Sequence, residues 1–406
     1  MFCITGSIEG AMPKRHRYGQ KITLVGCTPR ILSCLALNAQ ARGRAPATRA
    51  GEMCMQPRTA LLPGASRGRP LRALLGLLAA LTLCLAPAAQ AERKVRFTAN
   101  WAFEASNAPF VLAAQRGYFE EEGLDVTVDA GEGSSAVITR IAGGSYEAGF
   151  GDINTLIEFN ARHPDNRQRM VYMIYNRPPL AIITLKESGI EAPKQLEGKA
   201  IGAPANDSAY RMFPLFAEAA GLDSDKIRFE NVAPNLREAM LVQGKVDAIA
   251  GFPPSAVPNL LKLGIDQDDI RIFYYSDYGV PLYSNGLIVT ERMIEQEPEV
   301  VQGLVRASHR GLKASIDDPL AAAEALREKD SLINVELEQQ RMRFLIDNQL
   351  ITEEVKKNGL GAVDPQRLAA SIEVVAEALE LDNPPAPDQV FDGAFLDALE
   401  DRSVAQ

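Results

Sequence analysis

The sequence predicts an α/β protein made of two lobes joined by a hinge, with a ligand cleft between the lobes. Strand-type and helix-type segments alternate from residue 94 to residue 177, which is typical of sheets covered by helices. Pro178 and Pro179 interrupt this alternation, which then starts again. Without its leader the chain keeps about 315 residues, more than the about 100 to 200 typical of one domain. We therefore expect two lobes.

The first 91 residues are expected to be a leader. Arg67, Arg69 and Arg72 precede an apolar run over residues 73–87, and Ala89-Gln90-Ala91 has the small-x-small pattern of a signal peptidase site. The apolar run is too short to span a bilayer, so we expect a signal peptide cleaved before Glu92 and no membrane insertion afterwards. Residues 1–52 have no such pattern and are expected to be an over-extended gene start.

The composition after the leader excludes several function classes. All five cysteines lie within residues 1–91, so the rest of the chain has no thiol for a disulfide, a metal site or a nucleophile. The leader also holds 12 Lys and Arg but only 2 Asp and Glu, which leaves a net charge of about −19 on the remainder and disfavours nucleic acid as a partner. His163 and His309 lack metal-ligand spacing and are expected to face solvent, so we expect no metal site and no serine triad.

The first lobe is expected to contain residues 92–177 and 282–406. It opens with a strand over residues 94–99, a polar loop over 100–107 and a helix that begins at Pro109, where a missing N–H costs nothing. After residue 291 the chain is expected to be almost wholly helical. Further strands are expected at residues 124–128, 146–151, 170–175 and 282–289, with helices at 136–142 and 154–162.

The second lobe is expected to contain residues 178–281. The chain crosses between the lobes near residues 177–179 and again near 277–281, so the first lobe is discontinuous. Strands are expected at residues 180–185, 200–203, 227–232, 246–250 and 270–275, with helices at 209–220 and 236–243.

A glycine-rich run, Gly131-Glu132-Gly133-Ser134-Ser135-Ala136, follows a predicted strand and precedes a predicted helix. With Asp152 about 20 residues further on, it matches the dinucleotide-binding fingerprint, so a cofactor-dependent oxidoreductase is one alternative function. We favour another interpretation because the following helix is very short and a strand and helix already precede the run. Small residues at a helix start let a polar ligand approach backbone N–H groups, or simply make a tight turn. No cofactor is expected.

Polar and aromatic side chains recur where the predicted strands end, which is the edge where open α/β sheets bind ligands. Trp101, the only tryptophan, is expected to stack on a planar ligand together with Tyr210 or Phe252. Asp152 or Asp207 is expected to accept a hydrogen bond from an amino or cationic group. Several of these residues also suit helix caps or a core. The candidate ligand-binding residues are Trp101, Phe103, Glu104, Asn107, Gly133, Ser134, Ser135, Asp152, Asn206, Asp207, Ser208, Tyr210, Phe252, Tyr283 and Asn285.

At these residues the chain resembles the nitrate/sulfonate/taurine and thiamine-pyrimidine-precursor group of periplasmic binding proteins. The resemblance covers roughly residues 94–300 and is carried by short motifs. These motifs are Trp101, Asn107, Gly117-Tyr118-Phe119, Glu122-Gly123-Leu124-Asp125-Val126, Gly133-Ser134-Ser135 and Gly244-Lys245-Val246-Asp247-Ala248. The resemblance implies the type II periplasmic binding protein fold, which closes two lobes over a ligand and delivers it to an inner-membrane ABC permease with its ATPase.

Within this group the opening loop resembles the pyrimidine-precursor branch, which typically has a Trp-x-Pro-Asn-Thr-Asn-His loop. This chain instead has Trp101-Ala-Phe-Glu-Ala-Ser-Asn107, so the ligand stays open between an aminopyrimidine, a sulfonate and an aromatic acid. Fungal relatives of that branch are pyrimidine synthases with a cysteine-rich iron motif, so an enzyme of this kind is a second alternative. We expect a monomeric periplasmic solute-binding protein rather than an enzyme, although a sensor that delivers its ligand to a receptor is also compatible.

Overall fold

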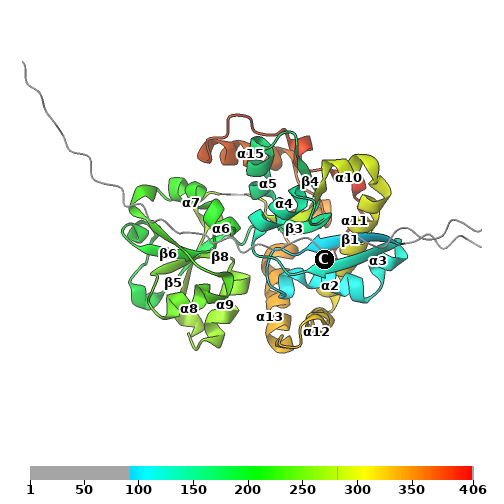
Figure 1. Ribbon diagram of the computed structural model, residues 1–406. Coiled ribbons are helices and arrows are strands. Elements are labelled where there is room, and N and C mark those ends of the chain that lie inside the picture. Colours follow the sequence, from blue (N-terminus) through cyan, green and yellow to red (C-terminus); the bar gives the residue numbers. More distant parts are fainter. Residues whose placement is uncertain (1–91, 281, 405–406) are drawn as a thin grey trace, which may run out of the picture. The chain divides into compact units, whose positions relative to one another are not determined.

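The computed structural model describes residues 92–280 and 282–404, which belong to one compact unit. The expected gene start, signal peptide and cleavage site at residues 1–91 lie outside the described residues. Two five-stranded sheets organise the described chain (Figure 1). Within the described residues, none of the helices combines the length and apolar character needed to cross a membrane.

The first sheet has the strand order β2-β1-β3-β10-β4. Strand β1 pairs in parallel with β2 and β3, whereas β10 is antiparallel to both β3 and β4. The strands are β1 (Arg93–Thr98), β2 (Leu124–Asp129), β3 (Ala148–Asp152), β4 (Gln168–Met173) and β10 (Asn285–Thr290). Alternation along β10 places Leu287 and Val289 in one apolar cluster and Ile288 in another, so both faces of this sheet are buried.

Helices cover the two faces of the first sheet. One apolar cluster packs α2 (Ala108–Gln115), α11 (Pro298–Asp317) and α12 (Pro319–Lys329) with β1, and the other packs α4 (Ser134–Ala142) and α5 (Ile153–Arg162) with β10. The other helices of this part are α3 (Tyr118–Glu121), α10 (Glu291–Gln296), α13 (Val335–Leu345), α14 (Glu353–Asn358) and α15 (Pro365–Ala378), with a π-helical turn at Ile346–Leu350. The predicted helical character after residue 291 is therefore observed, although residues 379–404 hold only short turns.

The second sheet has the strand order β7-β6-β8-β5-β9. Its helices lie on opposite sides, with α6 and α7 on one side and α8 and α9 on the other (Figure 1). The strands are β5 (Ala181–Leu185), β6 (Ala200–Ala203), β7 (Arg228–Asn231), β8 (Ala248–Gly251) and β9 (Ile270–Tyr274). The helices are α6 (Ser208–Arg211), α7 (Phe213–Ala219), α8 (Arg237–Val242) and α9 (Pro253–Lys262).

Both sheets are mixed, whereas the alternation in the sequence suggested mostly parallel ones. In each sheet two strand pairings are parallel and two are antiparallel. The antiparallel pairings involve β5 and β10, the first strand after each crossing between the sheets. A strand that enters a sheet from the other sheet does not come through a βαβ crossover, so nothing requires it to be parallel.

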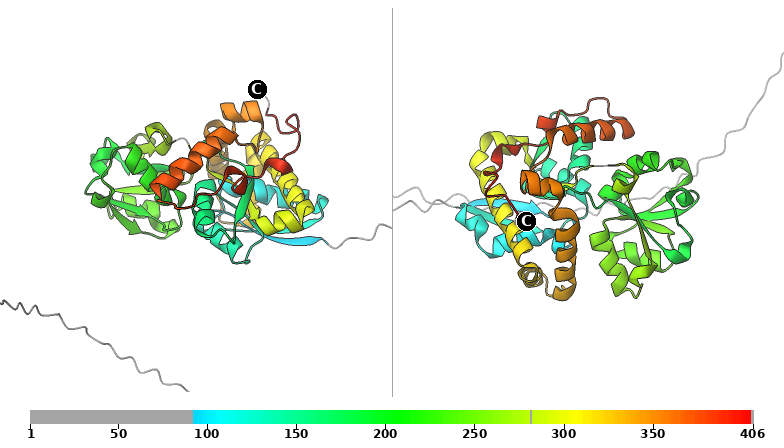
Figure 2. Two further views of the ribbon diagram at one scale, coloured as in Figure 1. Left: turned by 90° about the horizontal axis from the view of Figure 1, so that it is seen from above. Right: turned by 180° about the vertical axis from the view of Figure 1, so that it is seen from behind.

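One apolar cluster includes residues of both sheets. It joins α4 and α5 of the first sheet to α6 and α7 of the second, and Leu368, Ile372 and Val375 of α15 belong to it. Helix α15 contacts both α5 and α7, and Figure 2 shows it in orange-red beside the green helices of the second sheet. Helix α15 therefore connects the two sheets in addition to the chain crossings.

Three local predictions need correction. The helix expected over 209–220 is divided at Met212, because Pro214 has no N–H to continue the first segment. Helix α9 was not expected, although Pro253 and Pro254 occupy its first turn as Pro109 does in α2. His309 is buried within α11 rather than solvent-facing, and its Nδ1 lies within hydrogen-bond distance of the Tyr172 hydroxyl, at 2.8 Å. Burial lowers the pKa of His309.

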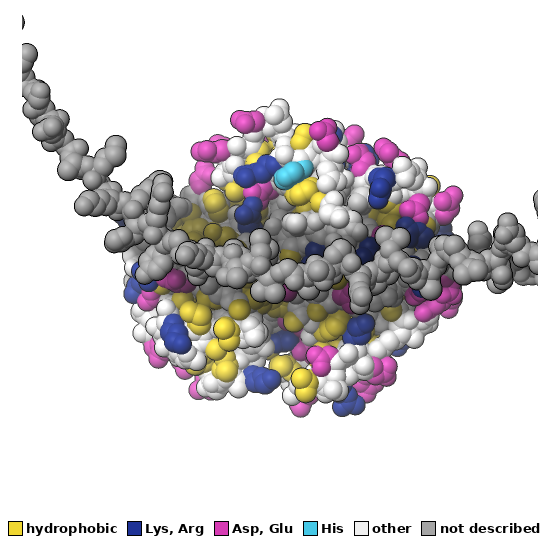
Figure 3. Space-filling view, in the orientation of Figure 1, with side chains coloured by type: hydrophobic (Ala, Val, Ile, Leu, Met, Phe, Trp, Pro, Cys, Tyr) yellow, Lys and Arg dark blue, Asp and Glu magenta, His cyan; other side chains and the backbone are white. Residues whose placement is uncertain are grey.

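The described surface mixes charges of both signs. On the face drawn in Figure 3, where the grey residues do not cover it, Asp and Glu side chains alternate with Lys and Arg and form no continuous basic patch. This distribution agrees with the acidic balance of the sequence after the leader.

Candidate functional site

The loop after β1 is held in place by backbone hydrogen bonds to the turn after β2. Gly133 N donates to Asn100 O at 2.6 Å, and Gly131 N donates to Trp101 O at 2.8 Å. On the other side, Ala105 N donates to the Glu338 carboxylate at 2.8 Å. Asn100 and Trp101 therefore project from a backbone that is fixed at both ends.

The two glycines of the Gly131-to-Ala136 run make room for other parts of this chain. A Cβ atom at Gly131 would lie 1.8 Å from Ala99 O, and one at Gly133 would lie 2.3 Å from Asn206 O. Gly133 also has a φ of 111°, which only glycine adopts readily. Since Asn206 belongs to the second sheet, Gly133 permits the loops of the two sheets to meet. The space that a dinucleotide fingerprint would leave for pyrophosphate is therefore filled by the chain itself.

The second sheet supplies the opposite wall through the segments after β6 and β8. Asp207 caps α6 by accepting a hydrogen bond from Ala209 N at 2.8 Å. The Ser208 hydroxyl lies 3.0 Å from the Ser134 hydroxyl of the first sheet, and Phe252 precedes the first residue of α9. Direct polar contacts thus connect the two walls.

Arg237 lies at the centre of this wall. Its guanidinium donates to Glu238 at 2.7 Å and to Asp207 at 3.2 Å, and it lies over the Trp101 ring at 5.3 Å from the centroid. A Cβ at Gly251 would lie 2.3 Å from the guanidinium, so a side chain there would displace Arg237 from this position. Burial lowers the pKa of Arg237, but the carboxylates of Glu238 and Asp207 more than offset this effect and raise it overall.

A second buried group of charges lies at the other end of the Trp101 loop. Arg341 of α13 donates to Glu338 and to the Asn259 side chain of α9, both at 2.6 Å. Glu104 accepts a hydrogen bond from the Ser255 hydroxyl of α9 and lies 3.6 Å from Arg341. These contacts also join the two sheets. The pKa of Glu338 is raised to about 7, mainly by burial; the charge of Arg341 opposes this shift and that of Glu104 adds to it.

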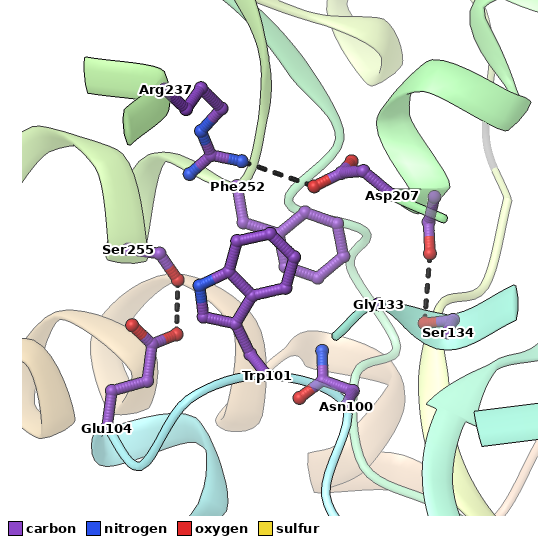
Figure 4. A pocket seen from close by; sticks show the side chains of 10 residues that line it. Asn100, Trp101, Glu104, Gly133, Ser134, Asp207, Arg237, Phe252 and Ser255 are labelled. Carbon is purple, nitrogen blue, oxygen red and sulfur yellow. Dashed lines mark hydrogen bonds and ion pairs between the residues drawn. The ribbon is translucent and has the colours of Figure 1, made fainter. Parts of the chain in front are cut away.

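Two adjoining cavities lie between the walls. The inner one has a volume of about 20 Å³, comparable to a single water, because side chains fill it. Figure 4 shows the Trp101 indole beside the Phe252 ring, with Asn100 and Asp207 around them. The outer cavity has a volume of about 950 Å³, within the range of small-molecule sites. Residues that line the inner cavity are Asn100, Trp101, Glu104, Gly133, Ser134, Asp207, Ser208, Arg237, Phe252 and Ser255.

Buried carboxyl groups outnumber buried guanidinium groups around these cavities. Four carboxyl groups (Glu104, Asp207, Glu238 and Glu338) accompany only two guanidinium groups (Arg237 and Arg341), and each of these six side chains is at most 8% exposed. Burial raises the pKa of Asp207 despite the opposing charge of Arg237. The site therefore holds more acid than the two guanidinium groups neutralise.

Asn100 carries a buried side-chain oxygen without a partner. Its Oδ1 makes no hydrogen bond to any described residue, although Asn100 is only 7% exposed and lines the inner cavity. An unpaired buried amide oxygen is costly in free energy unless another molecule supplies a donor.

The structure brings together nine of the fifteen residues that the sequence predicted. All nine line the inner cavity, the outer cavity or both. They are Trp101, Phe103, Glu104, Gly133, Ser134, Asn206, Asp207, Ser208 and Phe252.

The other six line neither cavity. Asp152 is fully buried and caps α5, and its burial raises its pKa to about 6. Tyr283 bonds to Glu354, and Asn285 is buried in β10 beside Ser284. The remaining three also lie elsewhere. Asn107 donates a hydrogen bond to Ala102 O, Ser135 lines a separate cavity, and Tyr210 packs edge-on against Phe229.

Sequence reasoning missed Asn100, Arg237 and Ser255 in the inner cavity. In the outer one it missed the polar residues Glu132, Asn231, Asn235, Glu238, Asn259, Lys262 and Arg341. Asn100 is the first residue of the loop after the first predicted strand, so the strand-end rule could have identified it. Ser255 belongs to the unexpected helix α9. Arg341 lies far along the chain from the other lining residues, and no local pattern distinguishes it or Arg237.

Several proteins of known function have similar sequences. A formylaminopyrimidine-binding protein of Halalkalibacterium halodurans is 26% identical over 263 residues, which cover 64% of this chain and 78% of that protein. The riboflavin-binding protein RibY of Chloroflexus aurantiacus is 24% identical over 297 residues, which cover 71% and 82%. A 4-amino-5-hydroxymethyl-2-methylpyrimidine phosphate synthase of Aspergillus parasiticus is 28% identical over 241 residues, which cover 57% and 69%.

Solved structures have the same fold. The alkanesulfonate-binding protein SsuA of Xanthomonas axonopodis pv. citri, bound to MOPS, superposes with a TM-score of 0.59 at 16% identity and covers 75% of this chain and all of that one. A Candida albicans protein, CA3427, described as having the generic periplasmic binding protein fold, gives 0.57 at 16% identity over 75% of this chain and 98% of that one.

These likenesses, together with the two sheets and the cavities between them, show the periplasmic binding protein fold, with two α/β lobes, a hinge and a ligand cleft. The sequence profile of the family described as NMT1/THI5 like matches residues 104–322, more than half of the chain, and the protein belongs to this family.

Proposed function

We propose that this protein is the solute-binding component of an ABC importer and that it captures a planar, nitrogen-containing ring rather than an oxyanion. The observation that carries this proposal is the buried charge around the inner cavity. Its guanidinium, Arg237, is already held by Asp207 and Glu238, so no unpaired cation remains among the described lining residues for a sulfonate, nitrate or carboxylate. The excess carboxyl groups instead suit an amino or protonated ring nitrogen.

The aromatic lining supports a ring as ligand. Trp101 and Phe252 come from opposite walls, and an inner cavity of about 20 Å³ admits a ring only when these side chains move apart. A ring stacked on Trp101 would have its edge near Asn100 and Asp207. An amino group on the ring could donate to Asp207, and a second N–H could donate to the unpaired Asn100 oxygen. Two relatives with similar sequences are named for binding formylaminopyrimidine and riboflavin, which contain nitrogenous rings.

Closure of the lobes would trap the ligand. Contacts that join the sheets around the site include the hydrogen bonds of Ser208 with Ser134, Ser255 with Glu104, and Arg341 with Asn259. A ligand that contacts both walls stabilises the closed arrangement relative to an open one, and binding is therefore a population shift. The further expectations of a cleaved signal peptide, a periplasmic location, a monomer, and a permease with its ATPase belong to this proposal.

A pyrimidine synthase is the competing function, because relatives such as the Aspergillus parasiticus protein carry that name. The chain from residue 92 onward contains no cysteine, whereas the fungal synthases that the sequence resembles use a cysteine-rich iron motif. This difference supports binding rather than synthesis.

Isothermal titration calorimetry tests the proposal. The purified chain from residue 92 onward is titrated with 4-amino-5-hydroxymethyl-2-methylpyrimidine, riboflavin, taurine, an alkanesulfonate and nitrate. We expect binding of a ring compound without turnover and no measurable binding of the anions. Tight binding of a sulfonate or nitrate, or release of a new pyrimidine product, would contradict the proposal.

A further inference from the structure

The outer cavity is far larger than a stacked ring requires. It has a volume of about 950 Å³ and shares Trp101 and Glu104 with the inner cavity of about 20 Å³. Small-molecule sites have volumes of about 300 to 1,000 Å³ and bury most of their ligand. A single ring held against Trp101 would leave most of the outer cavity unfilled.

The wall of the outer cavity that belongs to the second sheet is rich in side-chain amides. Asn206, Asn231, Asn235 and Asn259 all line it. Asn231 accepts from Ala205 N at 3.2 Å, and Asn259 accepts from Arg341 at 2.6 Å. The side chains of Asn206 and Asn235 are exposed and make no hydrogen bond within the described residues. A free amide offers both donors and an acceptor, which matches hydroxyl groups.

The charges of the same cavity disfavour an anionic group. Arg341 is already bonded to Glu338 and Asn259, which leaves Lys262 at the exposed end as the other cation among the described lining residues. Three carboxylates line the cavity as well, Glu104, Glu132 and Glu238, of which Glu132 pairs with Arg140 and Glu238 with Arg237. A phosphate or carboxylate would therefore meet more negative than positive charge.

From these observations we infer that the outer cavity is a subsite for a neutral, hydroxyl-rich substituent on the ring. The ligand class is then a ring joined to a sugar or polyol, and not a bare ring or a phosphorylated one. This inference rests on the proposed function, because the ring must occupy the inner site for its substituent to reach Asn206 and Asn235.

Matched compound pairs test the inference in the chain from residue 92 onward. Cytosine and cytidine share a ring and differ by a ribose, and lumiflavin and riboflavin share a ring and differ by a ribityl chain. Cytidine 5′-monophosphate and riboflavin 5′-phosphate add a phosphate to each. In at least one pair we expect the hydroxyl-bearing member to bind about tenfold more tightly than the bare ring, which is the gain that two neutral hydrogen bonds would provide. We expect the added phosphate to abolish this gain.

The double variant Asn206→Ala/Asn235→Ala should bring the affinity ratio of that pair close to one. Asn383→Ala, at an exposed asparagine that lines neither cavity, is the matched control and should leave the ratio unchanged. Thermal unfolding of each variant verifies that the fold is retained.

The possible outcomes separate the two proposals. If bare rings bind and the hydroxyl-bearing members gain nothing, the outer cavity is only a solvent-filled entrance and the subsite is refuted while the proposed function stands. An unchanged ratio in the double variant, or tighter binding of the phosphorylated members, also refutes the subsite. If no ring compound of any kind binds, the proposed function fails and the subsite fails with it.

Discussion

The guanidinium of Arg237 lies over the ring of Trp101, 5.3 Å from its centroid, and joins the two walls of the cleft. Trp101 follows β1 of the first sheet, whereas Arg237 begins α8 beside the second sheet. The contact places the only tryptophan of the chain against a buried ion-paired network that includes Asp207 and Glu238. A ligand that stacks on Trp101 must therefore be compatible with this network.

Removal of the indole should weaken ligand binding. Trp101→Ala removes the stacking surface and should cost about 1 to 3 kcal/mol of binding free energy for a ring compound. Trp101→Phe keeps an aromatic face and should lose less. Calorimetric titration with the ring compound that binds best measures both changes, and equal affinities for wild type and Trp101→Ala would place the ligand elsewhere.

Removal of the Arg237 guanidinium should destabilise the fold. Arg237→Met leaves Asp207 and Glu238 buried without their counter-charge, which costs about 3 to 5 kcal/mol of unfolding free energy. Arg228→Met is the control, because Arg228 is 68% exposed and its bond to Glu230 should contribute less than about 1 kcal/mol. Urea denaturation measures both variants. Equal losses in the two would mean that Arg237 has no special structural role.

A methyl group at Gly133 should hinder closure. The Cβ of Gly133→Ala would lie 2.3 Å from Asn206 O of the other wall, so the two loops must separate. Gly144→Ala is the matched control, since Gly144 also has a positive φ, of 71°, but its Cβ would meet nothing within 4 Å. We expect Gly133→Ala to lose ligand affinity and to stay extended in small-angle scattering with ligand present. Ligand-induced compaction equal to that of Gly144→Ala would disprove this role.

The unfolding free energy should depend on pH through Glu338. Its carboxyl pKa is raised to about 7 in the folded protein, from an ordinary value of 4.5, mainly by burial. A raised carboxyl pKa contributes stability that is fully present below pH 4.5 and is lost as the pH rises through 7, at most about 3 kcal/mol. Glu338→Gln should therefore make the decline of unfolding free energy between pH 5 and 8 smaller, leaving the part that comes from Asp152, whose pKa burial raises to about 6.

Urea denaturation at a series of pH values measures this slope. Glu353→Gln is the control, because the Glu353 side chain is 91% exposed and should leave the slope unchanged. If Glu338→Gln keeps the wild-type slope, the Glu338 carboxyl does not contribute to it, and the prediction is wrong.

The sequence predicted the two-sheet organisation because local patterns determine it. Alternation in strands such as β10 and the proline at the first position of α2 are visible without any tertiary information. The same proline signal occurs at Pro253, so helix α9, and with it Ser255, was also predictable. The direction of β5 and β10 was not, because strand pairing is a long-range property.

The candidate site was predictable only where its residues follow strands. Trp101, Asp207 and Phe252 were identified in this way, since strand ends meet at one edge of a sheet. The same rule proposed Asp152 and Asn285, which are buried next to each other in paired strands instead. Arg341 is separated by more than 230 residues from Glu104, and only the folded chain brings them together.

The fluorescence of Trp101 tests the central claim most directly, because no other tryptophan contributes to the emission. A ligand identified by calorimetry is added to saturation while the emission spectrum is recorded. Since the ligand is proposed to stack on Trp101 and to displace it from Phe252 and Arg237, we predict a change in emission that titrates with the calorimetric Kd. An unchanged spectrum with a saturating ligand would contradict this placement of the binding site.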